Sequence, residues 1–467
     1  MGAPVVLSTR PFLILYVVWH PAFDEGRSIA KKLYEHYRRE LYSNVAGGAG
    51  LSVIYRQAPD PTTSMPAAID LSEGETSAVV LLIDEGFAGD ANYVAWTKSL
   101  LTQTETVGLS ARVFPVAIAS DATRLGIAEQ AVRWDRWATL EADARLRRLT
   151  SDLTYQFCRM LRSYLEHLLR PNEEAAALEQ YLKKVQVFLS HSKHDADGGR
   201  IARQIRQRIF DGDGLASFFD VHDIPTGVRF DTVLLLQVRV SAVIALHTDS
   251  FSSREWCRRE IIEAKRWNAP LVVADCISDT DERGFPYLGN VPVVRMDPDK
   301  VDRIDHVIAR LLDEVLKDFL WRCRVQLMQS AGAAGAAFLP RSPELVSLAG
   351  LSSLPGDRLL VVYPDPPLGA EEQRLFEEIA PRYHLRSLTE WLATTGAADC
   401  PTASLLARRP SGSLYPVAKT WKSLVSRKST CAMPWPKLLD TCWQWVRGWC
   451  TGEISANMGL RSYFSSW

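Results

Sequence analysis

Residues 185–195 read Val-Gln-Val-Phe-Leu-Ser-His-Ser-Lys-His-Asp, a short apolar run that turns polar at Ser190. An apolar run of this length predicts a strand that is buried on both faces, as in a parallel sheet. The polar residues follow at the carboxyl end of the strand, where open α/β sheets bind their ligands. Ser190 and His191 are therefore candidate ligand-binding residues.

The rest of this region alternates between apolar runs and helical patterns. Helical spacing predicts helices over 199–210 and 302–328. Further strands are predicted at 216–219, 241–246, 270–274 and 292–295. Strands that alternate with helices favour a doubly wound α/β fold. We assign residues 176–329 to one such domain.

The sequence before this domain follows the same plan. Apolar runs predict strands at 12–19, 51–55, 78–83 and 112–117, and residues 27–42 have helical spacing. A helical stretch over 141–182, with a connector around 170–174, leads into the next domain. Residues 1–175 are thus predicted to form a first α/β domain.

The sequence after residue 329 is less regular. Small residues over 330–337 open a predicted linker that extends to 356. A strand at 357–363 and a helix at 370–379 predict a small, incomplete α/β unit over 357–407. Residues 408–467 hold six of the 14 tryptophans among Ser, Lys and Arg. Their apolar residues keep neither the spacing of a helix nor the alternation of a strand. We expect a loosely ordered tail there; a membrane-surface or partner-binding segment is the alternative.

Composition narrows the classes of protein that are possible. The formal net charge of -1 gives no overall attraction to nucleic acid or membrane, so no direct nucleic-acid partner is predicted. The eight cysteines form no CxxC pair and no zinc-type cluster, which is typical of free thiols in a reducing compartment. No signal-peptide pattern and no apolar run of about 18 residues is present. We expect a cytoplasmic protein without a transmembrane segment.

Two more polar stretches follow predicted strands of the 176–329 domain. Residues 219–229 read Phe-Asp-Val-His-Asp-Ile-Pro-Thr-Gly-Val-Arg, and Pro225 and Gly227 predict a mobile turn that closes over a ligand. Residues 253–260 read Ser-Arg-Glu-Trp-Cys-Arg-Arg-Glu. Trp256 and Glu260 are four apart, so they share one face of a helix.

In this order, the strand with its Ser-His, the Asp-Ile-Pro-Thr-Gly loop and the Trp-Cys-x-x-Glu helix resemble the three sequence boxes of Toll/interleukin-1 receptor (TIR) domains. The resemblance covers residues 183–298 and is to the bacterial-type TIR NAD hydrolases. It implies flavodoxin-like parallel sheets and Glu260 as the acid that breaks the nicotinamide–ribose bond. It also implies that residues 220–229 form the flexible BB loop, which in this family often packs on a neighbouring protomer.

The resemblance also implies the chemistry. As nicotinamide leaves, the ribose gains oxocarbenium character, which a carboxylate stabilises. The predicted substrate-binding residues are Ser190, His191, Phe219, Asp223 and Trp256, with Phe219 or Trp256 as the platform for the nicotinamide ring. The sequence has no GxxxxGK[ST], GxSxG or strand-associated GxGxxG motif, so NAD+ is predicted as a substrate and no cofactor or metal is implied.

The first domain is similar in layout but lacks the acid. Tyr93-Val-Ala-Trp96 corresponds to the tryptophan of the later helix, and Leu100 stands four residues on. We predict a degenerate TIR-like domain for sensing, scaffolding or pairing.

The whole chain is then predicted to be a TIR NAD+ glycohydrolase that acts as a triggered immune, antiphage or cell-suicide effector. Its partners would be NAD+, other copies through TIR–TIR contacts, and an unidentified activator. Either ADP-ribose or cyclic ADP-ribose fits as the product. Two alternatives stay open: a non-catalytic TIR scaffold, and a nucleoside deoxyribosyltransferase-like enzyme.

Overall fold

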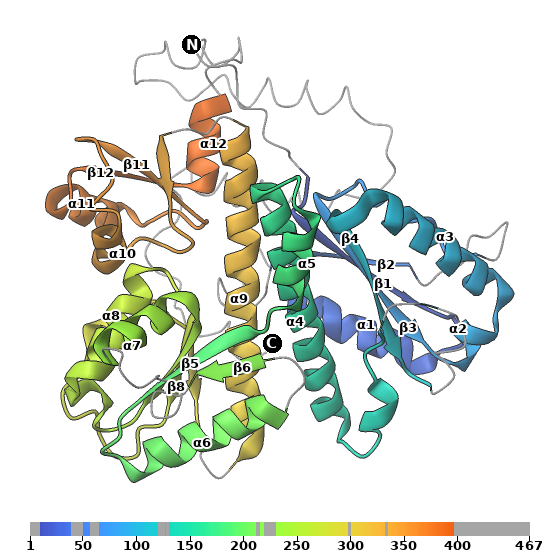
Figure 1. Cartoon of the computed structure of the whole chain (residues 1–467), viewed down its shortest axis with the longest axis horizontal. Coiled ribbons are helices and arrows are strands. Elements are labelled where there is room, and N and C mark those ends of the chain that lie inside the picture. The colour runs from blue at the N-terminus through green and yellow to red at the C-terminus, as the bar shows by residue number, and fades with distance from the viewer. Residues whose placement is uncertain are drawn as a thin grey trace, which may run out of the picture. The chain divides into compact units, whose positions relative to one another are not determined.

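The computed structural model describes residues 10–38, 50–56, 65–119, 127, 130–211, 215–218, 230–297, 300–331 and 335–396. These residues form an α/β fold with three sheets (Figure 1). All strand pairs within the sheets are parallel in the described part of the chain. The predicted α/β class with parallel sheets is therefore confirmed. The tryptophan-rich tail lies outside the described residues, and its character stays a prediction.

The first sheet has the strand order β2-β1-β3-β4. Its strands are β1 (Leu13–Trp19), β2 (Ser52–Tyr55), β3 (Thr76–Ile83) and β4 (Ala111–Ala117). Alternate residues of β1 enter two different cores: Leu13, Leu15 and Val17 join one, and Ile14, Tyr16 and Val18 the other. Because both faces are covered, the strand reads as an unbroken apolar run.

The helices of this region are α1 (Asp24–Tyr37), α2 (Glu85–Gly89) and α3 (Ala91–Val107), with 3-10 turns η1 (Gly108–Ser110) and η3 (Trp134–Trp137). Helix α1 begins three residues earlier than predicted. Its predicted residues 39–42 lie outside the described part. Helix α3 was not predicted, because its Thr and Gln residues interrupt the apolar pattern.

The second sheet has the order β6-β5-β7-β8-β9. Its strands are β5 (Val185–His191), β6 (Leu215–Phe218), β7 (Ala242–His247), β8 (Leu271–Asp275) and β9 (Val293–Arg295). All five predicted strands are confirmed, with ends that differ by at most one residue. From β5 the chain passes to β6 on one side and then to β7 on the other, so the order in which strands are added reverses between β5 and β7. Open α/β sheets bind their ligands at such a position.

The second sheet is covered on both faces. Helices α7 (Phe230–Val240) and α8 (Glu255–Arg266) share a core with Phe188 and Val243 on one face. Helices α6 (Ala196–Asp211) and α9 (Val301–Ser330) share a core with Val187 and Ile244 on the other. Two 3-10 turns, η4 (Phe251–Ser253) and η5 (Pro286–Leu288), lie in the connections.

The first two sheets are joined by a pair of long helices, α4 (Ala142–Leu169) and α9, which pack along each other (Figure 1). Small thiols lie at the contact: Cys158 Sγ donates to the Leu312 carbonyl at 3.8 Å, and Cys323 Sγ to the Leu161 carbonyl at 3.4 Å. One continuous core runs through both helices and both sheets. A short helix, α5 (Glu174–Leu182), follows α4 after a break at the predicted connector.

The third sheet has the order β10-β11-β12. Its strands are β10 (Ala336–Phe338), β11 (Leu359–Tyr363) and β12 (Tyr383–Ser387). The helices of this region are α10 (Leu345–Gly350), α11 (Ala370–Ile379) and α12 (Leu388–Gly396). The predicted linker over 330–356 is wrong for residues 336–338 and 345–350, which belong to this sheet and its helices. A three-residue strand, Ala-Ala-Phe, has too short a pattern to be seen before its partner β11 is known.

The third sheet is attached directly to α8. Lys265 is buried, and its Nζ donates to Glu344 Oε2 at 2.7 Å and to the Gly289 carbonyl at 2.6 Å. At Gly350 a Cβ atom would collide with the Arg266 carbonyl oxygen, so only glycine allows this approach of α10 to α8. The position of α8 thus depends on residues far along the chain. Among the helices that the structure describes, none is both long and apolar enough to cross a membrane.

Phe157→Ala tests the importance of the shared core. Phe157 is fully buried in α4 between the rings of Tyr37 and Phe114. We expect the free energy of unfolding in urea to fall by about 3–5 kcal/mol, because the lost ring leaves a cavity. Leu169→Ala, at the exposed end of the same helix, is the control and should change it by less than about 0.5 kcal/mol. Equal effects of the two variants would contradict the shared core.

Candidate functional site at the end of the second sheet

The first and third of the predicted motifs meet at the carboxyl end of β5. Glu260 lies on α8 and is 7% exposed. Ser190 is the second-last residue of strand β5, and its Oγ donates to Glu260 Oε2 at 2.5 Å. A buried carboxylate needs such a donor. The fold therefore brings together two residues that are 70 positions apart in the sequence.

Glu260 borders a cavity of about 330 Å³. His191, the last residue of β5, also lines it, as does Trp256 one helical turn before Glu260. Small-molecule pockets begin near this volume. Ser190 is not among the lining residues, so within the described part it acts on Glu260 and does not face the cavity.

Trp256 is 38% exposed, and the guanidinium carbon of Arg259 lies 4.3 Å from its ring centroid. The cation covers one face of the indole.

A network of hydroxyls fixes the turn that follows β5. Ser192 Oγ lies 2.8 Å from Ser250 Oγ and accepts from the His194 backbone N–H at 3.3 Å. Thr248 Oγ1 donates to the Asp195 carboxylate. These bonds connect the segment after β5 to the segment after β7.

Positive charge at the cavity was not predicted. Lys193 and Arg254 both line it, as does His194, which follows Lys193 in the turn after β5. Arg254 Nε is buried and has no hydrogen-bond partner among the residues described. The Ser-Lys-His-Asp run after the strand was the available signal, but the sequence does not tell which of its side chains line a cavity.

Cys257 lines the same cavity but is not a nucleophile. Burial, with a smaller contribution from the Glu260 carboxylate, raises the pKa of Cys257 to about 12. The reactive form of cysteine is the thiolate. At neutral pH this residue is a protonated core side chain.

A Ser, a His and an Asp also meet beyond β7, but not as a catalytic triad. The same nitrogen, His247 Nε2, lies 3.2 Å from Ser252 Oγ and 3.1 Å from Asp281 Oδ2. A triad needs the base to contact its two partners through different nitrogens. Ser252 is also fully buried, and its hydroxyl donates to Asp281 at 3.0 Å. This cluster holds the loop before α8.

Four predicted site residues, Phe219, Asp223, Pro225 and Gly227, lie outside the described residues, so their roles stay predictions. Trp96 and Leu100 of helix α3 are both buried in the core that covers one face of the first sheet. Position 100 therefore holds a leucine where the second sheet's helix has Glu260. No group of three or more His, Cys, Asp or Glu side chains suited to a metal ion occurs in the described ranges.

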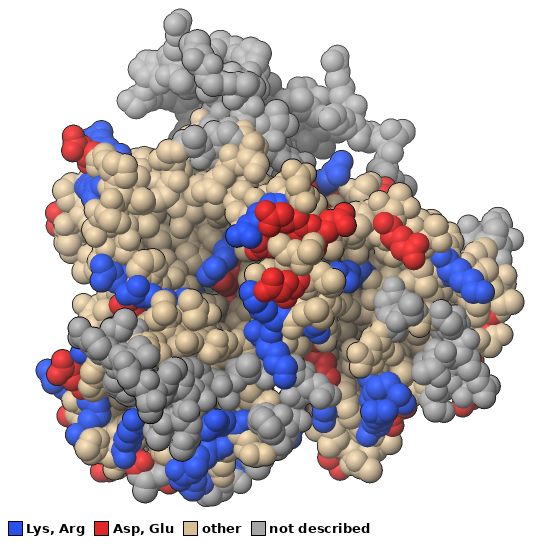
Figure 2. Space-filling view, in the orientation of Figure 1, with Lys and Arg blue, Asp and Glu red and all other residues tan. Residues whose placement is uncertain are grey.

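Lys and Arg side chains gather on the surface where α6 lies (Figure 2). Helix α6 carries Arg200, Arg203, Arg206 and Arg208. Arg200 pairs with Asp197, and Arg208 pairs with Asp305 at 2.7 Å. Carboxylates therefore neutralise part of this basic surface.

The comparisons with known proteins add no relative. No protein-family model matches this chain, and no curated protein matches its sequence.

The state of Cys257 can be tested by alkylation. In the folded protein its reaction with iodoacetamide should be slow and should not rise between about pH 7 and pH 9, because its raised pKa keeps the thiol protonated. In urea the rate should rise with pH through the ordinary thiol pKa of about 8.5. Peptide mapping by mass spectrometry measures both. A fast, pH-dependent reaction in the folded state would contradict the burial.

Proposed function

We propose that the second sheet and its helices form an NAD+ glycohydrolase of the TIR type, with Glu260 as its essential acid. The observation that carries the proposal is the buried Glu260 carboxylate, held by Ser190 at the wall of a cavity. A buried acid beside a cavity at the switch point of an α/β sheet is a common arrangement of a catalytic group.

The topology supports this reading. Counted within this sheet, the strand order is 2-1-3-4-5, which is the flavodoxin-like order that the TIR resemblance implies. The first sheet has the order 2-1-3-4, which supports a related origin for the predicted degenerate domain. Fold alone does not define activity, so the proposal depends on Glu260.

In the proposed reaction, the bond between ribose C1′ and the nicotinamide nitrogen breaks, and its electron pair leaves with nicotinamide. Water adds its oxygen to C1′ and releases one proton, which gives ADP-ribose; attack by the adenine of the same substrate gives the cyclic product. The ribose is cationic in the transition state. A carboxylate preorganised beside it stabilises that charge more than it stabilises the substrate.

The remaining groups at the cavity suit the rest of the substrate. Trp256 supplies an aromatic ring at the cavity wall for the nicotinamide, and Lys193 and Arg254 supply positive charge for the pyrophosphate. Ser190 is then a positioning residue, since it contacts the acid. His191 borders the same space.

The cavity is at the lower end of the range for ligand pockets. We infer that the loop over 219–229, or a neighbouring protomer, completes the site. Activity would then depend on assembly, which fits an immune or cell-suicide effector that stays inactive until a signal arrives.

Glu260→Gln, assayed for NAD+ consumption by the purified full chain, tests the proposal. We expect the rate to fall by about 10²–10³-fold or more, because the charge that stabilises the transition state is lost. Glu263→Gln is a matched control: Glu263 is a buried acid on the same helix, bonded to Arg239 and Trp267 and absent from the cavity wall. This control should keep most of the activity.

The same assay over a range of protein concentrations tests assembly. We expect the rate per protomer to rise with concentration if neighbouring copies complete the site. A rate per protomer that stays constant would instead favour a site complete in one chain. Absence of NAD+ loss at every concentration would favour the non-catalytic scaffold.

A further inference from the structure

Helix α5 carries an apolar stripe on its exposed face. Ala175, Leu178 and Leu182 recur at spacings of three and four residues, so they lie along one side of the helix. All three are exposed, and the exposed fractions of Leu178 and Leu182 are 56% and 64%. Single exposed leucines are ordinary, but two of them one turn apart on the same stripe form a small contact surface.

The opposite face of α5 is fixed to α4. Ala177 is fully buried, and Ser163 Oγ of α4 donates to its carbonyl at 2.8 Å. Arg159 Nε of α4 donates to the Tyr181 carbonyl at 2.7 Å, and the Arg159 guanidinium carbon lies 4.4 Å from the centroid of the Tyr181 ring. Because these contacts hold α5 in place, the stripe is preorganised, and little conformational freedom is lost when a partner binds it.

The two ends of α5 carry charges of opposite sign. Glu173 and Glu174 lie at its start, and Lys183 and Lys184 follow its last residue. All four are exposed. Figure 2 shows both acidic and basic side chains on the surface around α5. The exposed face of the helix therefore has an acidic end, an apolar middle and a basic end.

Two of these charges also form ion pairs within the chain. Glu173 Oε2 lies 3.5 Å from Arg170 Nη1, and Lys183 Nζ lies 3.4 Å from Glu179 Oε1. Each of these side chains is more than half exposed. Exposed ion pairs contribute little free energy, so they do not prevent either end of the helix from attracting opposite charge.

We propose that α5 is a contact between two copies of this chain, paired antiparallel about a two-fold axis that passes near Leu178. Antiparallel pairing places the acidic end of each helix beside the basic end of the other, whereas parallel pairing would bring like charges together. It also places Leu182 of each copy near Ala175 of the other, where the small side chain leaves room for the leucine. A surface that is complementary to itself in this way suits a two-fold contact.

The length of α5 limits the strength of this contact. Its nine residues span about 14 Å. Stable interfaces bury about 800 Å² on each partner, which is more than a helix of this length offers. We therefore expect a weak dimer that forms at micromolar or higher concentration. The contact lies outside residues 183–298, which carry the TIR resemblance, and does not depend on the proposed NAD+ cleavage.

Sedimentation velocity of the full chain, from low to high micromolar concentration, tests the proposal. We expect the sedimentation coefficient of the unmodified chain to rise with concentration. Leu178→Glu should raise the dimer Kd at least about tenfold, because two like charges then meet near the axis. Its Tm should stay the same, since position 178 is exposed. Leu375→Glu is the matched control: Leu375 lies on α11, is also 56% exposed, and should leave the Kd unchanged.

A charge exchange tests the antiparallel direction. Lys183→Glu combined with Lys184→Glu makes both ends of α5 acidic, so the dimer should weaken. Adding Glu173→Lys and Glu174→Lys to that variant exchanges the two ends and should restore the dimer. Added salt should weaken the dimer of the unmodified chain, because exposed charges are screened.

Three results would overturn the proposal: a sedimentation coefficient that does not change with concentration, the same Kd for Leu178→Glu as for the unmodified chain, or no recovery in the variant with exchanged ends. Glu260→Gln should associate like the unmodified chain, so loss of NAD+ cleavage and loss of this contact are separate outcomes.

Discussion

The packing of α4 against α9 is the contact on which the rest of the structure depends. Each helix covers a different sheet, yet their buried faces form one core with both. Cysteine is small, and Cys158 and Cys323 let the two helices approach closely enough for each thiol to reach a carbonyl of the other helix. His36 Nε2, at the end of α1, adds a polar contact to Asp313 of α9 at 2.9 Å. Because this core is shared, neither sheet can bury its own apolar face without the helix that belongs to the other.

The sequence predicts best those elements whose environment is the same on both faces. Strands β1, β3, β5, β7 and β8 are buried on each side, so their apolar runs are visible without knowledge of the fold. Strand β10 is different, because three residues become a strand only through pairing with β11. At the site, Ser190 and Glu260 were predictable from motif order. Arg254 and Lys193 were not, since the direction of a side chain in a loop is set by distant contacts.

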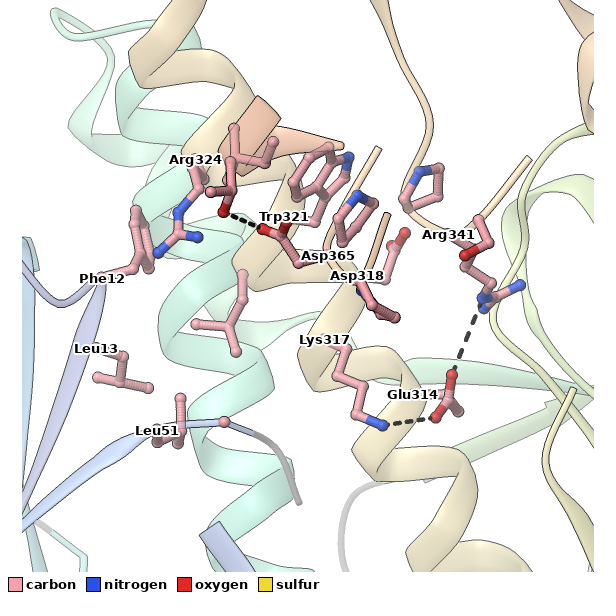
Figure 3. A pocket seen from close by; sticks show the side chains of 18 of the residues that line it. Phe12, Leu13, Leu51, Glu314, Lys317, Asp318, Trp321, Arg324, Arg341 and Asp365 are labelled. Atoms are coloured by element: carbon pink, nitrogen blue, oxygen red, sulfur yellow. Dashed lines mark hydrogen bonds and ion pairs between the residues drawn. The ribbon is translucent and has the colours of Figure 1, made fainter. Parts of the chain in front are cut away.

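The candidate site needs α8 to be held accurately, because Glu260 meets Ser190 across two elements. Inside the fold, Cys257, Ile261 and Ala264 anchor the helix in the core of the second sheet. At its end, Lys265 binds Glu344, and Gly350 allows α10 to lie against the backbone. The same helix α9 that completes the second sheet also lines a larger cavity, of about 920 Å³, together with residues of the first and third sheet regions (Figure 3). Both cavities therefore depend on elements that contribute to more than one sheet.

The Lys265–Glu344 bond has a consequence for the order in which the protein matures. The two residues are 79 positions apart, and protein synthesis proceeds from the N-terminus. At about 5–20 residues per second, roughly 4–16 s pass between the addition of Lys265 and that of Glu344. During this interval the ammonium has no carboxylate to accompany it into the interior, which disfavours its burial. The helix that bears Glu260 would then settle only after the first strand of the third sheet has been made, so the candidate site would take its final form late in synthesis.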